Sequence, residues 1–132
     1  MDIPFQVPRE VYFKDITSFK IDVIELTKNN LHFNAERVYI LSTEDSDNMS
    51  GNHAHLNQSQ ILFLLKGKAE LLLKSIDKKS YFFDLEGEGV FVPSKYWIEL
   101  KLSAHSVVLC IASRSYDTLQ SINDFNEFLR LR

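Results

Sequence analysis

Two histidines separated by a single residue are the side chains of this sequence best suited to chemistry. His53 and His55 lie in the run Gly-Asn-His-Ala-His of residues 51–55. On a β-strand, residues two apart point to the same side, so both imidazoles would face one cavity. Such a pair is able to bind a metal ion or to move protons near neutral pH. The remaining interpretation is two incidental surface histidines.

The elements that must position these histidines are short β-strands. Stretches rich in Val, Ile, Leu, Phe and Tyr recur at intervals of about ten residues, which is typical of an all-β sandwich or barrel. We expect strands at 36–42, 60–66, 69–76, 81–85, 90–92, 96–102 and 107–113, and one more between 16 and 26. The polar, acidic stretch 43–50 is expected to be a loop that ends at Gly51.

One of these strands has two different faces. Alternation places Arg37 and Tyr39 on one side and the aliphatic residues Val38 and Ile40 on the other. A closed barrel would use both faces, because its interior holds a ligand while its exterior packs on a second sheet or a partner. The alternative is a strand with one face in water.

The chain changes its pattern after residue 113. Leu119, Ile122, Phe125 and Leu129 recur every three or four positions, which predicts one terminal helix with Ser115 as its cap. No internal repeat, low-complexity tract or linker is present, so we expect residues 1–132 to form a single domain.

Composition limits the possible partners. The net charge is −3, and 15 basic residues are scattered among 18 acidic ones, so a nucleic acid is not an expected partner. The first ten residues mix prolines and charges, and no apolar run approaches the roughly 18 residues of a membrane span. The single cysteine, Cys110, lies in an apolar run and is expected to be a buried thiol. We therefore expect a cytoplasmic protein without a membrane partner.

The histidine run and the residues after it resemble the first motif of the cupin superfamily. The matching residues are Gly51, His53, His55, Gln60 and Gly67. Residues 89–93 resemble the opening of the second cupin motif, but Trp97 and Ile98 stand where that motif supplies a further histidine. The resemblance implies a cupin-type antiparallel β-barrel, or jelly roll, here with a short C-terminal helix.

The missing histidine favours proton transfer over metal binding. Catalytic transition-metal sites generally have three protein ligands, and here Gln60 stands in place of a carboxylate. His32 and His105 are conceivable outside ligands. We expect no metal and no cofactor, because two imidazoles with an ordinary pKa of about 6.5 suit general acid–base catalysis.

A narrower resemblance covers the chain from about residue 31 to its end. The sequence is similar to the metal-free cupin sugar 3,4-ketoisomerases that act on dTDP-4-keto-6-deoxyglucose. The matching pieces are Phe33 with Arg37, Val38 and Tyr39; the histidine run with Gln60 and Gly67; Val92 and Pro93 with Trp97 and Glu99; and residues 112–113 with Tyr116, Asp117 and 124–129.

This resemblance implies an isomerase of a dTDP-linked 6-deoxyhexose in the deoxysugar biosynthesis of surface polysaccharides such as lipopolysaccharide O-antigen. It also implies a homodimer, allows an exchange of N-terminal strands between subunits, and puts one nucleotide-linked sugar in each barrel. His53 would be the base at sugar carbon 3, and His55 would shuttle a proton beside it.

Four further residues would bind the substrate according to the same resemblance. Arg37, Tyr39 and Gln60 would contact or orient the sugar, and Trp97 would offer a flat apolar surface to the sugar or the base. Each of them has an ordinary structural interpretation as well, and for Trp97 this is packing in the core.

The sequence departs from that family at two positions. Arginine usually occupies the positions of Ser50 and Ile98, so two guanidinium groups suited to a diphosphate are absent here. Lys66, Lys95 and Arg114 are the candidates to replace them. Two alternatives to the isomerase therefore stay open: a non-catalytic cupin module that binds a nucleotide sugar or a partner, and a metal-dependent cupin enzyme.

Overall fold

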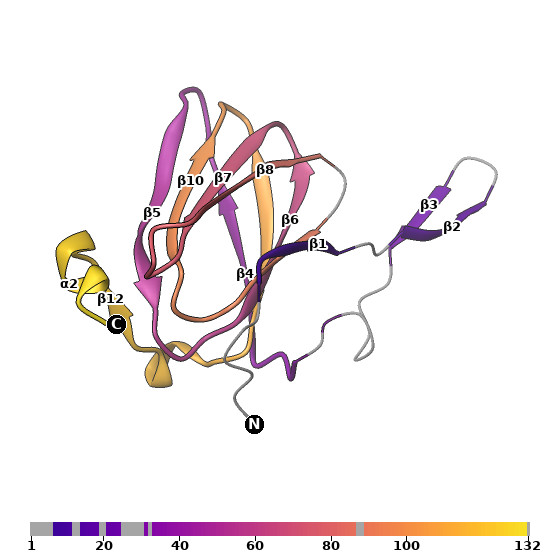
Figure 1. Cartoon of the computed structure of the whole chain (residues 1–132). Coiled ribbons are helices and arrows are strands. Elements are labelled where there is room, and N and C mark those ends of the chain that lie inside the picture. Colours follow the sequence, from indigo (N-terminus) through magenta and orange to yellow (C-terminus); the bar gives the residue numbers. More distant parts are fainter. Residues whose placement is uncertain are drawn as a thin grey trace.

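The computed structural model describes residues 7–11, 14–18, 21–24, 31, 33–86 and 89–131, and two five-stranded antiparallel sheets dominate them (Figure 1). One sheet has the order β1 (Arg9–Val11), β9 (Gly89–Val92), β6 (Gln60–Lys66), β11 (Val107–Ala112) and β4 (Arg37–Ser42). The other has the order β12 (Ser121–Ile122), β5 (Asn48–His55), β10 (Trp97–Leu102), β7 (Ala69–Lys74) and β8 (Ser80–Leu85). This is the all-β architecture that the sequence predicts.

The main core lies between the two sheets. Alternation on the strands turns one side chain in two toward the facing sheet. The buried cluster accordingly takes its members from both sheets, among them Leu62 of β6, Leu71 and Leu73 of β7, Leu100 of β10 and Cys110 of β11. Burial raises the pKa of the Cys110 thiol to about 12, so this cysteine is a buried thiol, as predicted.

The seven strands predicted between 36 and 113 correspond to β4 and β6 to β11, with ends that agree within two residues. The predicted loop at 43–50 is wrong at its end, because residues 48–50 pair with β10 and begin strand β5. The strand expected between 16 and 26 is instead two strands, β2 (Lys14–Ser18) and β3 (Ile21–Ile24), which pair with each other and join neither sheet.

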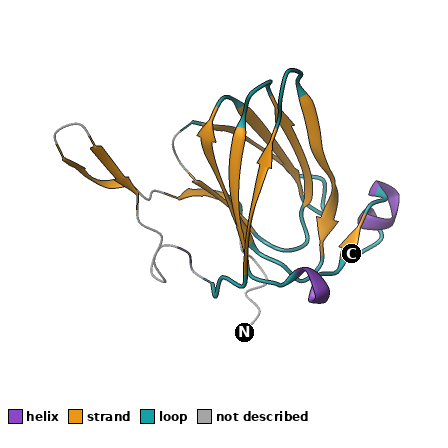
Figure 2. Cartoon of the chain, turned by 180° about the vertical axis from the view of Figure 1, so that it is seen from behind, coloured by secondary structure: helices purple, strands orange, loops and turns teal. Residues whose placement is uncertain are grey.

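The helix in the C-terminal segment is shorter than the periodicity of its apolar residues predicts. The only α-helix after residue 113 in the described part of the chain is α2 (Phe125–Leu129), and the side chain of Asp124, not Ser115, caps it. Before it come a 3₁₀ turn at Tyr116–Thr118 and the strand β12. Figure 2 shows these short helices at one end of a body made of strands.

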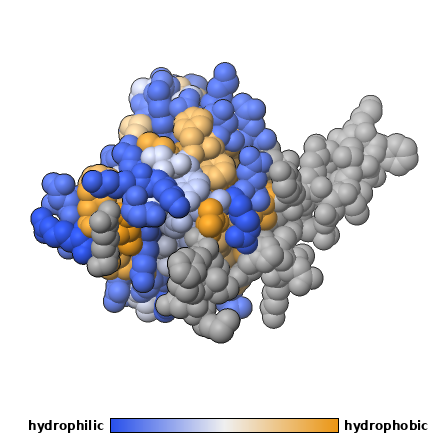
Figure 3. Space-filling model, in the orientation of Figure 1, coloured by the Kyte–Doolittle hydropathy of each residue, from blue (hydrophilic) through white to orange (hydrophobic). Residues whose placement is uncertain are grey.

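Two smaller apolar clusters cover the outer faces of the sheets. On the sheet that contains β6, the cluster includes Val11, Phe63 and Phe91. On the other sheet, α2 and β12 pack over Trp97. Part of the outer surface remains apolar, as Figure 3 shows over β8, where Phe82 is exposed. No helix in the described ranges has the length and apolar character of a membrane span.

Candidate active site inside the barrel

A β-bulge in β5 decides which way the two histidines point. Before the bulge, Ser50 pairs with the core residue Leu100 of β10 and faces inward with the other even-numbered residues. The register then shifts, and His53 pairs with the buried residue Ile98. From there the odd-numbered residues face inward, because an extra residue on one strand exchanges its two faces. The bulge thus brings His53 and His55 into the barrel.

Gly51 makes the bulge possible. Its φ of +103° belongs to the left-handed region, which costs a residue with a side chain about 1 kcal/mol or more. A Cβ atom at this position would also lie 2.6 Å from the carbonyl oxygen of Ile98. Asn52, the next residue, also has a positive φ, of 57°. Glycine is therefore required where the strand must approach β10 closely and turn.

The two imidazoles are in direct contact. The Nε2 atoms of His53 and His55 are 3.0 Å apart, and the rings meet edge to face with centroids 4.4 Å apart. Nδ1 of His55 lies 3.0 Å from Oγ of Ser121, and its backbone carbonyl accepts a hydrogen bond from the N–H of Lys95. His55 is thus held on three sides, and one of the two Nε2 atoms donates to the other.

Burial controls the charge of His55, which is only 7% exposed. Loss of solvation, the nearby His53 and the positive charge of Arg37 together lower the pKa of His55 to about 4. His55 is consequently a neutral imidazole at physiological pH, with one N–H donor and one lone pair. Such a ring is able to receive a proton on one nitrogen and release one from the other.

A polar network from the other sheet faces the histidines. Arg37 of β4 and Gln60 of β6 both pair with Ala112 of β11, so they lie in one row across the sheet. The hydroxyl of Tyr39 donates to Oε1 of Gln60 at 2.8 Å. Burial raises the pKa of the Tyr39 hydroxyl above its ordinary value, so it remains a protonated donor.

Arg37 brings a positive charge to this interior. Its guanidinium lies 4.6 Å from the ring centre of Tyr39 and donates to Oε1 of Gln58 at 3.3 Å. Its Nε atom is buried and has no hydrogen-bond partner among the described residues. A buried donor without a partner is costly, so this guanidinium is suited to an anionic or polar group of a ligand.

The structure separates Trp97 from the other predicted site residues. Trp97 lies on the outer face of β10, with ring centres 5.2 Å from Phe125 and 5.9 Å from Phe128. Alternation explains this placement, since the neighbouring Ile98 belongs to the core between the sheets. Trp97 anchors the C-terminal segment, and His53, His55, Arg37, Tyr39 and Gln60 face the interior without it.

Two residues of the site, Gln58 and Ser121, were not predicted from the sequence. Gln58 is 1% exposed and donates from Nε2 to Oε1 of Gln60 at 3.5 Å, so it links Arg37 to Gln60. The sequence feature that could have indicated Gln58 is its position two residues before Gln60, which places both side chains on the same side of an extended chain. Gln58 nevertheless lies just before the strand. Ser121 carries no signal, because its contact with His55 joins positions that are 66 residues apart.

The two residues that stand in place of the family's arginines also face the interior. Ser50 and Ile98 face the barrel from neighbouring strands, and Ile98 is buried beside His53. Of the candidate replacements, Arg114 is engaged elsewhere, since its Nε donates to the Asn57 carbonyl. Lys95 lies next to the site, where its backbone N–H donates to the carbonyl of His55.

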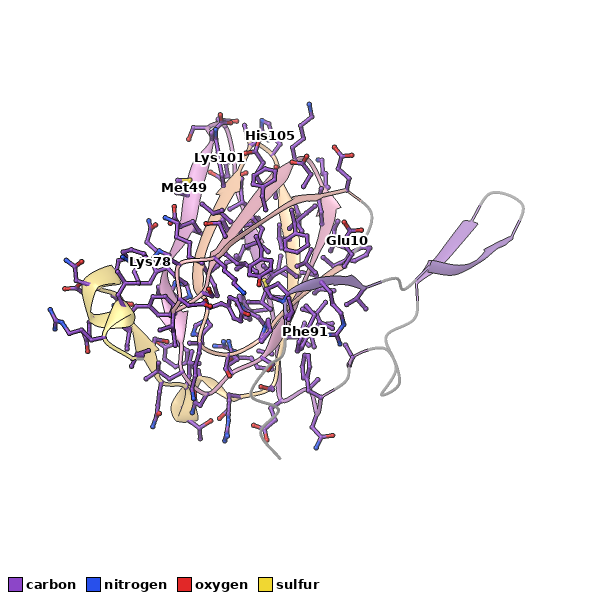
Figure 4. All side chains as sticks on the ribbon, viewed as in Figure 1. Glu10, Met49, Lys78, Phe91, Lys101 and His105 are labelled. Carbon is purple, nitrogen blue, oxygen red and sulfur yellow. The ribbon has the colours of Figure 1, made fainter. Side chains whose placement is uncertain are left out.

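The other histidines do not join His53 and His55 in a set of metal ligands within the described residues. Within the described ranges, no three or more His, Cys, Asp or Glu side chains lie together as metal ligands. His105 occupies a turn and pairs with Asp45 at 3.5 Å. Figure 4 places His105 at the end of the barrel opposite α2. His32 lies outside the described residues.

Known proteins are similar to this chain in sequence and in fold. The family described as FdtA, WxcM-like, C-terminal matches residues 3–132. The TDP-4-oxo-6-deoxy-alpha-D-glucose-3,4-oxoisomerase of Aneurinibacillus thermoaerophilus is 26% identical over 121 residues, which cover 89% of this chain and 87% of that protein.

Two solved structures are similar along nearly their whole length. The TDP-quinovose 3,4-ketoisomerase WlaRB of Campylobacter jejuni superposes with a TM-score of 0.86 at 26% identity, over 96% of this chain and 99% of that chain. A variant of the QdtA 3,4-ketoisomerase of Thermoanaerobacterium thermosaccharolyticum in complex with TDP superposes with a TM-score of 0.83 at 25% identity, over 93% and 91% of the two chains.

Proposed function

The chain belongs to the family described as FdtA, WxcM-like, C-terminal, and from this membership we propose that it is a 3,4-ketoisomerase of a dTDP-linked 6-deoxyhexose. The observation that carries the proposal is the hydrogen-bonded pair of His53 and His55 inside the barrel, opposite the Arg37 network. A pair of imidazoles and a buried cation are what a keto-sugar isomerisation needs.

The reaction moves a carbonyl between adjacent carbons without net oxidation. His53 removes the proton from carbon 3, which the carbonyl at carbon 4 has made acidic, and the electron pair forms an enediolate. The hydroxyl proton at carbon 3 moves to the oxygen at carbon 4, and a proton returned to carbon 4 completes the 3-keto product. His55 serves as the partner that takes up and returns protons, which its neutral state supports.

The opposite sheet would hold the substrate. Arg37 offers its unpartnered Nε to an oxygen of the sugar or the diphosphate. Tyr39, kept protonated by burial, and Gln60 are hydrogen-bonded to each other at 2.8 Å and would orient sugar hydroxyls or the developing enediolate. The substrate would lie between this network and the histidine pair.

The proposal is tested by following purified protein with dTDP-4-keto-6-deoxyglucose by proton NMR. We expect the 3-keto isomer with the wild-type protein and loss of turnover by roughly 10² to 10⁴-fold in His53→Asn, the range of general acid–base catalysis. His105→Asn is the matched control, because this exposed histidine lies away from the site. Absence of the isomer with the wild-type protein would overturn the proposal.

Metal independence is part of the proposal. In the described residues the two histidines hydrogen-bond to each other, which uses one of the two Nε2 lone pairs that a metal would need. Elemental analysis of protein purified without chelator should give well under one equivalent of any transition metal. A stoichiometric metal whose removal abolishes turnover would favour a metal-dependent cupin enzyme.

We further propose a cytoplasmic homodimer that serves surface-polysaccharide synthesis such as that of O-antigen. Val38 and Ile40 support the dimer, since they are 60% and 59% exposed on the edge strand β4. The hairpin of β2 and β3, which pairs with neither sheet (Figure 1), supports an exchange of N-terminal strands between subunits.

A non-catalytic binding module is the second candidate, and the inward positions of Ser50 and Ile98 favour it, because neither supplies a cation for the diphosphate. Calorimetry with dTDP separates the two functions. Tight binding that His53→Asn leaves unchanged, together with no turnover by the wild-type protein, would identify a binding module.

A further inference from the structure

Ser121 connects the histidine pair to the solvent. Its strand β12 pairs with β5 so that Ser121 lies opposite His55, and Ser121 itself is exposed. Its Oγ is 3.0 Å from Nδ1 of His55, whose Nε2 is in turn 3.0 Å from Nε2 of His53. Three exchangeable groups therefore stand in series from the barrel interior to its surface.

The Ser121 hydroxyl is able to pair with His55 in either of its two neutral tautomers. A neutral imidazole has one N–H and one lone pair, whereas a hydroxyl donates and accepts. When His53 donates to His55, the Nδ1–H of His55 donates to Ser121. When Ser121 donates to Nδ1, the Nε2–H of His55 donates to His53. A methyl group in place of the hydroxyl would satisfy neither arrangement, and a carboxylate would satisfy only the first.

We propose that Ser121 is a positioning residue that ends a proton relay from His53 through His55 to water, by letting His55 carry its proton on either ring nitrogen. This inference deepens the proposed isomerase and rests on it for its catalytic consequence. Nδ1 of His53 has no partner among the described residues, which leaves it available for the proton of the substrate.

The relay step is balanced. After His53 has accepted the substrate proton on Nδ1, its Nε2 proton passes to Nε2 of His55. The Nδ1 proton of His55 then passes to Oγ of Ser121, and the hydroxyl proton of Ser121 passes to water. All three side chains end neutral, and the enediolate keeps the electron pair. The reverse sequence supplies a proton for carbon 4.

The C-terminal segment fixes the place of Ser121. Ile122, its neighbour, is buried with Trp97 and Phe128 on the outer face of the sheet. Asn57 adds two hydrogen bonds of 2.9 Å to this segment, one from its Nδ2 to the carbonyl of Thr118 and one to its Oδ1 from the N–H of Gln120. Trp97 thus acts on the site indirectly, through the segment that it anchors.

Three substitutions at one position test the relay without substrate. Ring ¹⁵N chemical shifts of His55 report which nitrogen carries the proton. We expect intermediate shifts from both tautomers in the wild-type protein and in Ser121→Thr, a single tautomer in Ser121→Ala, and the Nδ1–H tautomer in Ser121→Asp, whose carboxylate only accepts. Identical His55 shifts in the wild-type protein and Ser121→Ala would overturn the inference.

The kinetic consequence is measured with dTDP-4-keto-6-deoxyglucose in deuterium oxide. We expect Ser121→Ala to lower kcat and deuterium uptake about tenfold, the effect of losing one orienting hydrogen bond, with KM nearly unchanged. Ser121→Thr should restore both rates. Ser115→Ala is the control, since its hydroxyl contacts Thr118 in the same segment and not His55.

The two hypotheses fail separately. If the wild-type protein does not isomerise this sugar, the isomerase proposal fails while the His55 shifts still decide whether Ser121 controls the tautomer. If the wild-type protein isomerises the sugar and Ser121→Ala does so at the same rate and with the same deuterium uptake, the relay is wrong and the isomerase stands.

Discussion

Among single residues, His55 links the pH of the solution to the stability of the fold. Its pKa in the folded protein is about 4, lowered from 6.5 chiefly by burial. As the pH falls, the unfolded chain binds this proton first, so stability should decrease between pH 6.5 and about 4, by at most roughly 3 kcal/mol from this group. Above pH 6.5 the contribution is fully present.

Urea unfolding at several pH values checks this linkage. The difference in unfolding free energy between the wild-type protein and His55→Asn should shrink as the pH falls through that window, because the variant has no imidazole at this position to titrate. Parallel slopes for the wild-type protein and His55→Asn would refute the buried, neutral state of His55.

Gln58 is predicted to hold Arg37 in its binding position. Gln58→Met keeps the volume but removes the acceptor that Arg37 uses at 3.3 Å. We expect the Kd for dTDP, measured by calorimetry, to rise about tenfold, as for the loss of one charge-assisted hydrogen bond. The control is Gln120→Met, at an exposed position, which should bind like the wild-type protein. Unchanged affinity in Gln58→Met would exclude this role.

At the scale of the elements, the bulge in β5 is what turns a pair of histidines into a site. Gly51→Ala combines a positive φ with a contact of 2.6 Å to the Ile98 carbonyl. We expect a loss of about 2 kcal/mol or more in unfolding free energy and loss of turnover. Ser50→Ala, one residue earlier, should cost little. Wild-type stability and activity in Gly51→Ala would show that the bulge is not needed.

The C-terminal segment is the second element on which the site depends. Phe128 is fully buried against Trp97, and Phe128→Ala should leave a cavity that costs up to about 3 to 5 kcal/mol of docking free energy. Because the N–H of Leu56 donates to the carbonyl of Gln120, its hydrogen exchange should accelerate when the segment detaches. Exchange of Leu56 at the wild-type rate in Phe128→Ala would contradict this dependence, and Leu131→Ala is the matched control.

The elements also show how far sequence patterns reach. Alternation was sufficient to place Arg37 and Tyr39 on one face and Val38 and Ile40 on the other, because β4 is regular. It did not decide which face is inside, which follows from the packing of Tyr39 against the core between the sheets. The pattern after residue 113 was misleading, because Ile122 and Phe125 pack on the same apolar cluster from a strand and a helix. Packing on a shared surface produces helix-like spacing without a continuous helix.

In the whole molecule, the contacts that complete the site join distant parts of the chain. The spacing of His53 and His55 is local and could be predicted, whereas the pairing of β12 with β5 depends on the closed barrel. The family resemblance implied a place at the ligand for Trp97, although an aromatic residue suits a core as well as a sugar. Only the register of β10 assigns it to the outer face.

The proposed homodimer depends on the exposed apolar face of the edge strand β4. Val38→Lys combined with Ile40→Lys places two charges on the apolar face of the edge strand and should convert the expected homodimer to a monomer in sedimentation equilibrium. Phe82→Lys, at an exposed position of β8, should leave the mass unchanged. A wild-type protein that sediments as a monomer would contradict the proposed dimer.

The most direct measurement of the central claim uses dTDP-4-keto-6-deoxyglucose that carries deuterium at carbon 3. With the wild-type protein the label should leave carbon 3 as the 3-keto sugar forms, and His53→Asn should release it at least about 100-fold more slowly. Retention of the label at carbon 3 with the wild-type protein, or equally fast release with His53→Asn, would contradict proton removal by this histidine.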